Sequence, residues 1–233
     1  RLYGRSLQEF LSEETFEDRN PANTDHLLGA FPRSGAEDVE RAVEAARRAF
    51  PAWKALSRIR RGEHLDAFAQ LVKRDGEGLA RLMAQESGKA INEARADVTE
   101  GLHMVQFLAG RARMSAGDVL ASEVAEKESL VLRKPKGVVA CITPWNFPFA
   151  IPLWLAASAL AEGNTVVFKP AEETPATGQR VVELFQEAGL PSGVLNLLHG
   201  YGEEAGWPLV VHPDVDLVLF TGSEEVGSRI RQA

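Results

Sequence analysis

The chain has 233 residues, of which 45% are hydrophobic and 25% are charged, and its formal net charge is −7 at pH 7. This is the composition of a globular protein with a buried core, and an acidic balance without a basic block argues against a nucleic-acid partner. The single cysteine, Cys141, excludes an intramolecular disulfide, and the longest apolar stretch, 147–160, contains two prolines and is too short to span a membrane.

Residues 1–117 are predicted to form a mostly helical part that packs on the second half of the chain. Apolar residues recur at helical intervals from Val39 to Phe50, after Ser34 and Glu37 at capping-box spacing. Three further amphipathic stretches predict helices through Leu65–Val72 to a stop near Asp75-Gly76, from Gly78 to Gly88, and from Ile91 to Leu108. We expect their apolar stripes to face the core.

Residues 118–136 are predicted to form an arm that reaches towards another domain or subunit. Leu130–Leu132 has the length and apolar character of a short strand, and Lys134-Pro135-Lys136-Gly137 indicates a turn that leaves it.

Residues 137–233 alternate apolar strands with helices. Strands are predicted at Gly137–Ile142, Asn164–Phe168, Val194–Leu198 and Asp216–Phe220, and helices at Ile151–Ala161, Thr174–Gly189, Glu203–Val211 and from about Ser223. Strands that are apolar throughout, each separated by a helix, predict a parallel sheet covered on both faces. The predicted fold class is therefore α/β, a Rossmann-like doubly wound parallel sheet preceded by a helical segment.

Ligands of such sheets bind beyond the carboxyl ends of the strands. The first strand-end loop, Thr143–Pro148, uses two prolines to present Trp145 and Asn146. The second starts at Lys169 and contains Glu172, a carboxylate at the position where a dinucleotide fold binds a ribose diol. That carboxylate would repel a 2′-phosphate, which favours NAD over NADP. Taken alone, Trp145 also fits a core position, and Lys169 and Glu172 also fit a solvated turn.

The third and fourth loops are rich in glycine. Gly200–Gly206 misses the dinucleotide fingerprint by one residue and follows the third strand, so it is a weak signal by itself. In Phe220–Gly227, glycines and Ser223 precede a helix, whose amino-terminal amides can bind a diphosphate. Glu224 and Glu225 make this loop less positive than a P-loop, and no Lys-Ser/Thr pair follows, so a phosphotransferase is a poor match.

These motifs occur in one order: Thr-Pro-Trp-Asn-Phe-Pro at 143–148, Lys-Pro-Ala-Glu at 169–172 and Phe-Thr-Gly-Ser-x-x-x-Gly at 220–227. Together they resemble the aldehyde dehydrogenase superfamily. The likeness covers essentially the whole chain, including Arg19-Asn20-Pro21-Ala22 and Glu86-Ser87-Gly88-Lys89. It implies an NAD-dependent enzyme that oxidises an aldehyde to a carboxylic acid and assembles as a dimer or tetramer, with 118–136 contributing to the assembly.

The resemblance also implies roles for the loop residues. Asn146 matches the side-chain amide that stabilises the oxyanion when a thiolate adds to the aldehyde. Lys169 and Glu172 match the pair that holds the adenosine ribose, and Ser223 matches the hydroxyl on the diphosphate. The other positions that match the cofactor site are Ile142, Thr143, Pro144, Trp145, Gly202, Phe220, Thr221, Gly222 and, against adenine, Val226.

In this family a cysteine thiolate attacks the aldehyde to form a thiohemiacetal, and a glutamate assists hydrolysis of the thioester that follows. Both residues lie beyond the Gly-Ser loop in the family, so we expect them after Ala233. Cys141 is a poor substitute, because it sits in an apolar strand with no base or cation nearby. Phe147 and Trp154 resemble substrate-tunnel residues, although Trp154 also fits the core. His199 is expected to be a surface loop residue, and no metal-ligand cluster is visible.

Three hypotheses follow. The first is the cofactor-binding part of an aldehyde dehydrogenase, with a semialdehyde as the suggested substrate on resemblance alone. The second is a nucleotide-binding module without catalysis, and the third is an acyl-phosphate reductase of the same fold. The resemblance of the Pro-Trp-Asn-Phe-Pro loop and Glu172 favours the oxidising enzyme over the reductase. With no leader visible after Arg1, we expect a cytoplasmic protein.

Overall fold

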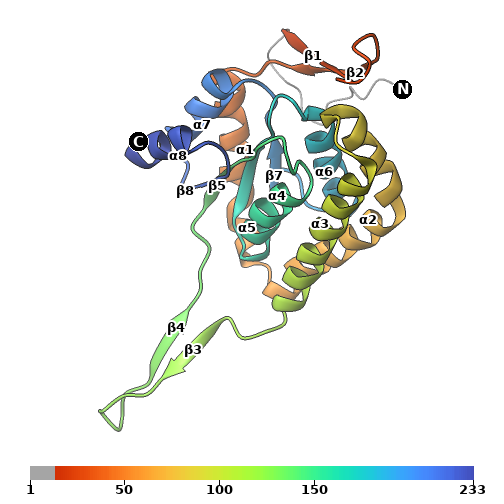
Figure 1. Cartoon of the computed structure of the whole chain (residues 1–233). Coiled ribbons are helices and arrows are strands. Elements are labelled where there is room, and N and C mark those ends of the chain that lie inside the picture. Colours follow the sequence, from red (N-terminus) through yellow and green to blue (C-terminus); the bar gives the residue numbers. More distant parts are fainter. Residues whose placement is uncertain (1–13) are drawn as a thin grey trace.

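The four apolar runs of the second half pair as one parallel sheet. The computed structural model describes residues 14–233, and in it β5 (Val138–Ile142), β6 (Thr165–Lys169), β7 (Leu195–Leu197) and β8 (Leu217–Phe220) lie in the order β7-β6-β5-β8 (Figure 1). The chain runs outwards from β5 to β7 and then returns to the other side of β5. This winding confirms the predicted doubly wound fold class.

Helices cover both faces of this sheet. They are α1 (Ala36–Ala55), α2 (Arg58–Ser87), α3 (Ile91–Arg111), α4 (Ala150–Pro152), α5 (Ser158–Ala161), α6 (Pro175–Glu187), α7 (Trp207–Val210) and α8 (Glu224–Gln232), with π-helical turns η1 (Leu153–Ala157) and η2 (Gly202–Gly206). Successive strand residues point to opposite faces. Val139 and Cys141 therefore join the core beneath α2, α3, α5 and α6, whereas Val138 and Ala140 join a second core beneath α1 and α7.

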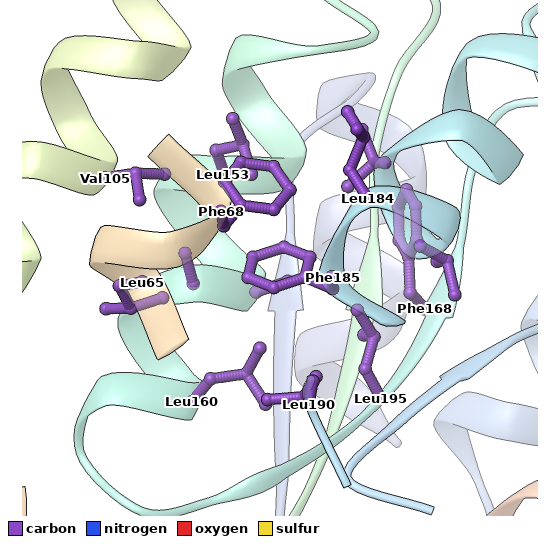
Figure 2. Close-up of a cluster of buried hydrophobic side chains, with 14 of the residues drawn as sticks. Leu65, Phe68, Val105, Leu153, Leu160, Phe168, Leu184, Phe185, Leu190 and Leu195 are labelled. Atoms are coloured by element: carbon purple, nitrogen blue, oxygen red, sulfur yellow. The ribbon is translucent and has the colours of Figure 1, made fainter. Parts of the chain in front are cut away.

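The larger core is built around a pair of aromatic rings. Phe68 of α2 and Phe185 of α6 stack with their ring centroids 3.9 Å apart, and Leu65, Leu160 and Leu184 lie in the same cluster (Figure 2). Burial of one such side chain contributes about 1.5–3 kcal/mol. The cluster therefore fixes α2 and α6 against the sheet and against each other.

A hairpin at the start of the described chain was not predicted. β1 (Thr15–Arg19) pairs antiparallel with β2 (Leu27–Pro32), and Phe16 packs on Tyr201 with ring centroids 5.6 Å apart. Helices α1, α2 and α3 still form most of the described part of 1–117, and residues 1–13 lie outside that part. Asp18 occupies one of the two inward positions of β1, and this buried carboxyl breaks the apolar alternation that would have indicated a strand.

A second hairpin projects away from the body of the molecule (Figure 1). β3 (Gly117–Leu120) pairs antiparallel with β4 (Ser129–Leu132), which confirms the strand predicted at Leu130–Leu132. The bridging role of 118–136 stays a prediction.

The predicted helix end at Asp75-Gly76 is wrong, because α2 continues through Gly76 and Gly78 to Ser87. Each internal glycine costs a helix about 1 kcal/mol relative to alanine. Packing of α2 against α3 and α6 outweighs this cost, and Asp75 accepts a hydrogen bond from Arg180 of α6 at 2.7 Å.

Other predicted helices differ in detail. The amino-terminal cap of α1 is Gly35 rather than Ser34, and the Gly35 N–H donates to Asp38 Oδ2 at 3.4 Å. The predicted helices at 151–161 and 203–211 each include a wide π-helical turn, η1 or η2. Pro152 directly precedes η1 and Pro208 lies two residues after η2, and a proline has no N–H to donate to the helix.

Candidate functional site

The two halves of the winding meet between β5 and β8, and in doubly wound sheets the ligand crevice opens at this point. The Thr221 N–H donates to the Ile142 carbonyl at 3.2 Å, so the loop after β8 starts beside the loop after β5. On the other side, the Thr143 N–H donates to the Lys169 carbonyl at 3.3 Å. Three of the four predicted loops therefore start side by side.

The loop after β5 presents polar and aromatic groups to solvent. Trp145 is 54% exposed, and Asn146 and Phe147 are also exposed, whereas Thr143 is buried. The alternative that Trp145 fills the core is therefore wrong. Trp154, on η1, is also exposed, so a core position is wrong for it as well.

The side chain of Lys89 contacts the backbone and an aromatic ring of this loop. The Asn146 carbonyl accepts a hydrogen bond from Lys89 Nζ at 2.8 Å, and the same ammonium lies 4.6 Å from the centre of the Phe147 ring. The loop is thus tied to the segment between α2 and α3, a contact that the strand-end argument did not predict.

The loop after β6 contains a buried ammonium. Lys169 is 3% exposed, and its Nζ donates to Glu172 Oε2 at 3.1 Å and to the Pro170 carbonyl at 3.0 Å. A solvated turn with two ordinary surface charges is therefore wrong. The ammonium has a third donor, and the carboxylate retains accepting capacity, which together match the donors and acceptors of a ribose diol.

The loop after β8 is built around an aromatic ring. A Cβ on Gly222 would clash with the Phe220 ring, so the ring packs directly against the glycine backbone. Ser223 is the amino-terminal cap of α8, and its Oγ accepts from the Val226 N–H at 3.3 Å. Its hydroxyl hydrogen remains able to donate, and the first amides of α8 form the kind of helix terminus that binds anions.

Near the third loop, Gly202 lies in open space and His199 is buried. A Cβ on Gly202 would meet no atom within 4 Å, so packing gives no reason for glycine there. The prediction that His199 is a surface residue is wrong, because it is buried with its ring centroid 4.9 Å from that of Phe31. Burial and the nearby Lys169 charge lower the pKa of His199 to about 3, so its imidazole is neutral at physiological pH.

A pair of buried carboxyl groups adjoins the site and was not predicted. Glu86, near the end of α2, accepts hydrogen bonds from the backbone N–H groups of Ala176 and Thr177 and from the Thr177 hydroxyl. Burial and the charge of Asp18 raise the pKa of Glu86 well above its usual range, and burial raises the pKa of Asp18 to about 6. The sequence does indicate that Glu86 is buried, because this residue falls on the apolar stripe of its helix.

A cavity of about 650 Å³ lies between the β1–β2 hairpin and the strand-end loops. It brings together Trp145 and Glu172, two of the predicted site residues, with Asp18 and Glu86 in the same wall. Its lining does not include Asn146, Lys169 or Ser223.

Cys141 takes no part in this site. It is completely buried, and burial raises the pKa of its thiol far above its usual range, so the reactive thiolate does not form there. Among residues 14–233, no three His, Cys, Asp or Glu side chains are grouped so that they could hold a metal ion. None of the helices in that part of the chain combines the length and apolarity needed to cross a membrane.

A doubly wound sheet with a buried Lys-Glu pair at one strand end and a glycine-serine helix start at another defines an α/β domain of the dinucleotide-binding class. Comparison with known families gives the more specific assignment. The model of the aldehyde dehydrogenase family matches residues 10–233, and the chain belongs to this family.

Individual relatives agree with this assignment. The chain is 43% identical over 214 residues to α-ketoglutaric semialdehyde dehydrogenase of Bacillus subtilis (strain 168). The matched region covers 92% of this chain and 44% of that protein. Betaine aldehyde dehydrogenase from Staphylococcus aureus, solved in complex with NAD+, is 38% identical with a TM-score of 0.92 over 99% of this chain and 46% of that one. An NADP dependent enzyme from E. coli is 38% identical with a TM-score of 0.91, and the match covers 96% of this chain and 47% of that one. The chain thus spans about half the length of the relatives it matches.

Proposed function

We propose that this chain provides the NAD site and the oxyanion-stabilising amide of an enzyme that oxidises an aldehyde to a carboxylic acid. The observation that carries the proposal is the meeting of the strand-end loops, with the Asn146 loop between the Lys169–Glu172 loop and the Ser223 loop. Membership of the aldehyde dehydrogenase family and the NAD+ bound to the Staphylococcus aureus relative support it. When bound, NAD accepts the hydride that the aldehyde carbon loses.

The cofactor is proposed to lie along the carboxyl ends of the strands. Lys169 donates to a ribose hydroxyl and Glu172 accepts from one, while Ser223 and the first amides of α8 bind the diphosphate. The Glu172 carboxylate repels a 2′-phosphate, and NAD is therefore preferred over NADP. The remaining residues proposed to line the site are Ile142, Thr143, Pro144, Trp145, Gly202, Phe220, Thr221, Gly222 and Val226.

Asn146 is proposed to donate from its exposed amide to the aldehyde oxygen as that oxygen gains negative charge. Such a donor stabilises the charged state more than the neutral carbonyl, which makes it worth about 10²- to 10³-fold in turnover. Phe147 and Trp154 are proposed to line the approach of the substrate. Because Cys141 is inert, the nucleophile and the hydrolytic glutamate are proposed to belong to the part of the family's length that this chain does not span.

The substrate class proposed is a semialdehyde, on the similarity to α-ketoglutaric semialdehyde dehydrogenase. We also propose a cytoplasmic homo-oligomer in which residues 118–136 contribute to assembly.

The test is aldehyde-dependent formation of NADH by a polypeptide that contains these 233 residues together with the remaining length of the family. Asn146→Ala is expected to lower kcat by about 10²- to 10³-fold while leaving the affinity for NAD unchanged. Asn23→Ala, at an exposed turn, is the matched control and should leave kcat unchanged. Unchanged turnover in the Asn146 variant, or NADH formation that requires inorganic phosphate, would contradict the proposal.

A further inference from the structure

A largely buried ion pair supports the loop that carries Asn146. Lys89 follows the end of α2 and Asp97 lies in α3, and Lys89 Nζ is 3.0 Å from Asp97 Oδ2. The Asp97 side chain is completely buried, and the Lys89 side chain is 13% exposed. Neither residue contributes to the strand-end loops along the sequence.

The pair holds the loop at two points. Lys89 Nζ donates to the Asn146 carbonyl at 2.8 Å, and Asp97 Oδ1 accepts from the Ala150 N–H at 2.8 Å, where α4 begins. The ammonium also lies over the Phe147 ring, 4.6 Å from its centre. The Lys89 ammonium thus contacts Asp97 on one side and this loop on the other.

These contacts restrict the backbone that carries the Asn146 side chain. The Asn146 carbonyl lies in the peptide plane that follows its Cα, so fixing the carbonyl limits rotation about that Cα. The contact at Ala150 fixes the other end of the same turn. A displacement of about 1 Å at a catalytic group can lower turnover by about 10²-fold, so fixed geometry at this amide matters.

We propose that Lys89 and Asp97 are positioning residues that orient the Asn146 amide towards the reacting oxygen. The inference rests on the function proposed above for Asn146. It predicts that breaking the pair lowers kcat through Asn146 alone, without changing the affinity of the strand-end loops for NAD.

The variant must separate orientation from stability. Removing Lys89 alone would leave the buried Asp97 carboxylate without its cation, and an unpaired buried charge destabilises a fold strongly. The double variant Lys89→Met, Asp97→Asn removes both charges, keeps the length of the lysine side chain and retains an amide oxygen that can accept from Ala150. Lys73→Met, on the exposed face of α2, is the matched control.

The experiment measures kcat, the Kd for NAD and the melting temperature in the longer polypeptide described above, for the double variant, Asn146→Ala and the triple variant. The double variant is expected to lower kcat by about 10- to 10²-fold with an unchanged Kd for NAD. The triple variant is expected to match Asn146→Ala alone, because residues that act through one group are not additive.

The outcomes distinguish the two proposals. If the double variant keeps its full kcat, or if its effect multiplies with that of Asn146→Ala, the positioning role is overturned while the role of Asn146 stands. If Asn146→Ala itself leaves kcat unchanged, both proposals fail. Lys89→Arg keeps the positive charge and should therefore retain a higher kcat than the double variant. The positioning role is also overturned if kcat falls only in proportion to the melting temperature and Lys89→Arg has the same low kcat as the double variant.

Discussion

The choice between NAD and NADP is expected to depend on Glu172. Its carboxylate lies 3.1 Å from the buried Lys169 ammonium. In Glu172→Gln the repulsion of a 2′-phosphate disappears while an accepting oxygen remains. The Kd for NADP should fall by about tenfold, which corresponds to about 1.4 kcal/mol, with a smaller change for NAD. Titration calorimetry on the 233-residue chain measures both constants.

Glu173→Gln provides the control for this change. Glu173 is the next residue, lines the same cavity and is exposed, so its variant should leave the ratio of the two constants unchanged. Equal affinities for NAD and NADP in the unaltered chain would remove the basis of the prediction.

The buried pair Asp18 and Glu86 should make stability depend on pH. Burial raises the pKa of Asp18 from 3.8 to about 6 in the folded protein, so its contribution to stability is present below about pH 4 and is lost as pH rises through 6. Asp18→Asn removes this loss and can donate to Glu86. The variant should be more stable by on the order of 1–3 kcal/mol at pH 7.5, and this advantage should vanish near pH 4.

Urea unfolding at the two pH values measures the effect, with Asp25→Asn in the exposed turn of the same hairpin as the control. A gain for Asp18→Asn that is equal at both pH values would show that the carboxyl does not titrate as the structure implies.

The side chains on the strand-end loops could be predicted from the sequence better than the side chains that support these loops. Asn146, Glu172 and Ser223 follow apolar strands, so their place in the fold is a direct consequence of the strand pattern. Glu86 and Asp97 lie on apolar helix stripes, which signals a buried carboxylate but does not identify its partner. His199 was misjudged because its cover, Phe31, comes from a hairpin that was not predicted.

The contact between α3 and the segment from Phe149 to the start of η1 depends on a glycine at the point where the two approach. A Cβ on Gly101 would lie 2.7 Å from Phe149 Cδ1 and 2.8 Å from Leu153 Cδ1, closer than packed atoms allow. Gly101→Ala should therefore destabilise the fold by about 1–3 kcal/mol, despite the better helix propensity of alanine. This corresponds to a fall in melting temperature of about 2–12 °C in a chain of this size.

The same helix contains a matched control. A Cβ on Gly110 would meet no atom within 4 Å, so Gly110→Ala should be neutral or stabilising, by about 0.5–1 kcal/mol at most. Circular dichroism melts of the two variants give the comparison, and a Gly101 variant as stable as the Gly110 variant would mean that the two elements can separate at little cost.

Element types were predictable where one physical signal dominated. The parallel strands are apolar throughout, and the caps at Gly88, Gly163 and Gly189 adopt positive φ, as helix-ending glycines do. The break at Asp75-Gly76 was predicted from a local signal that tertiary packing overrides. The π-helical turns η1 and η2 leave no pattern in the sequence that differs from that of an ordinary helix.

The β3–β4 hairpin is not packed against the rest of the described structure. It projects from the body (Figure 1), and an isolated two-stranded hairpin is marginally stable in water. Val119 is 79% exposed and Leu130 is 60% exposed, and the two are directly paired across the strands. This apolar face is therefore expected to be covered in the assembled protein.

A pair of opposite charges on the hairpin would show whether this apolar face is buried between copies of the chain. Val119→Glu combined with Leu130→Lys keeps the net charge and places opposite charges across the hairpin, which preserves the strand pair while removing the apolar face. Sedimentation velocity at several concentrations should show association of the unaltered chain and a monomer for this variant. Glu123→Lys combined with Lys127→Glu, in the exposed connection between the strands, keeps the apolar face and should still associate. A sharp monomer for the unaltered chain would mean that the hairpin is not where copies meet, because burial of two such side chains on each copy should contribute several kcal/mol to association.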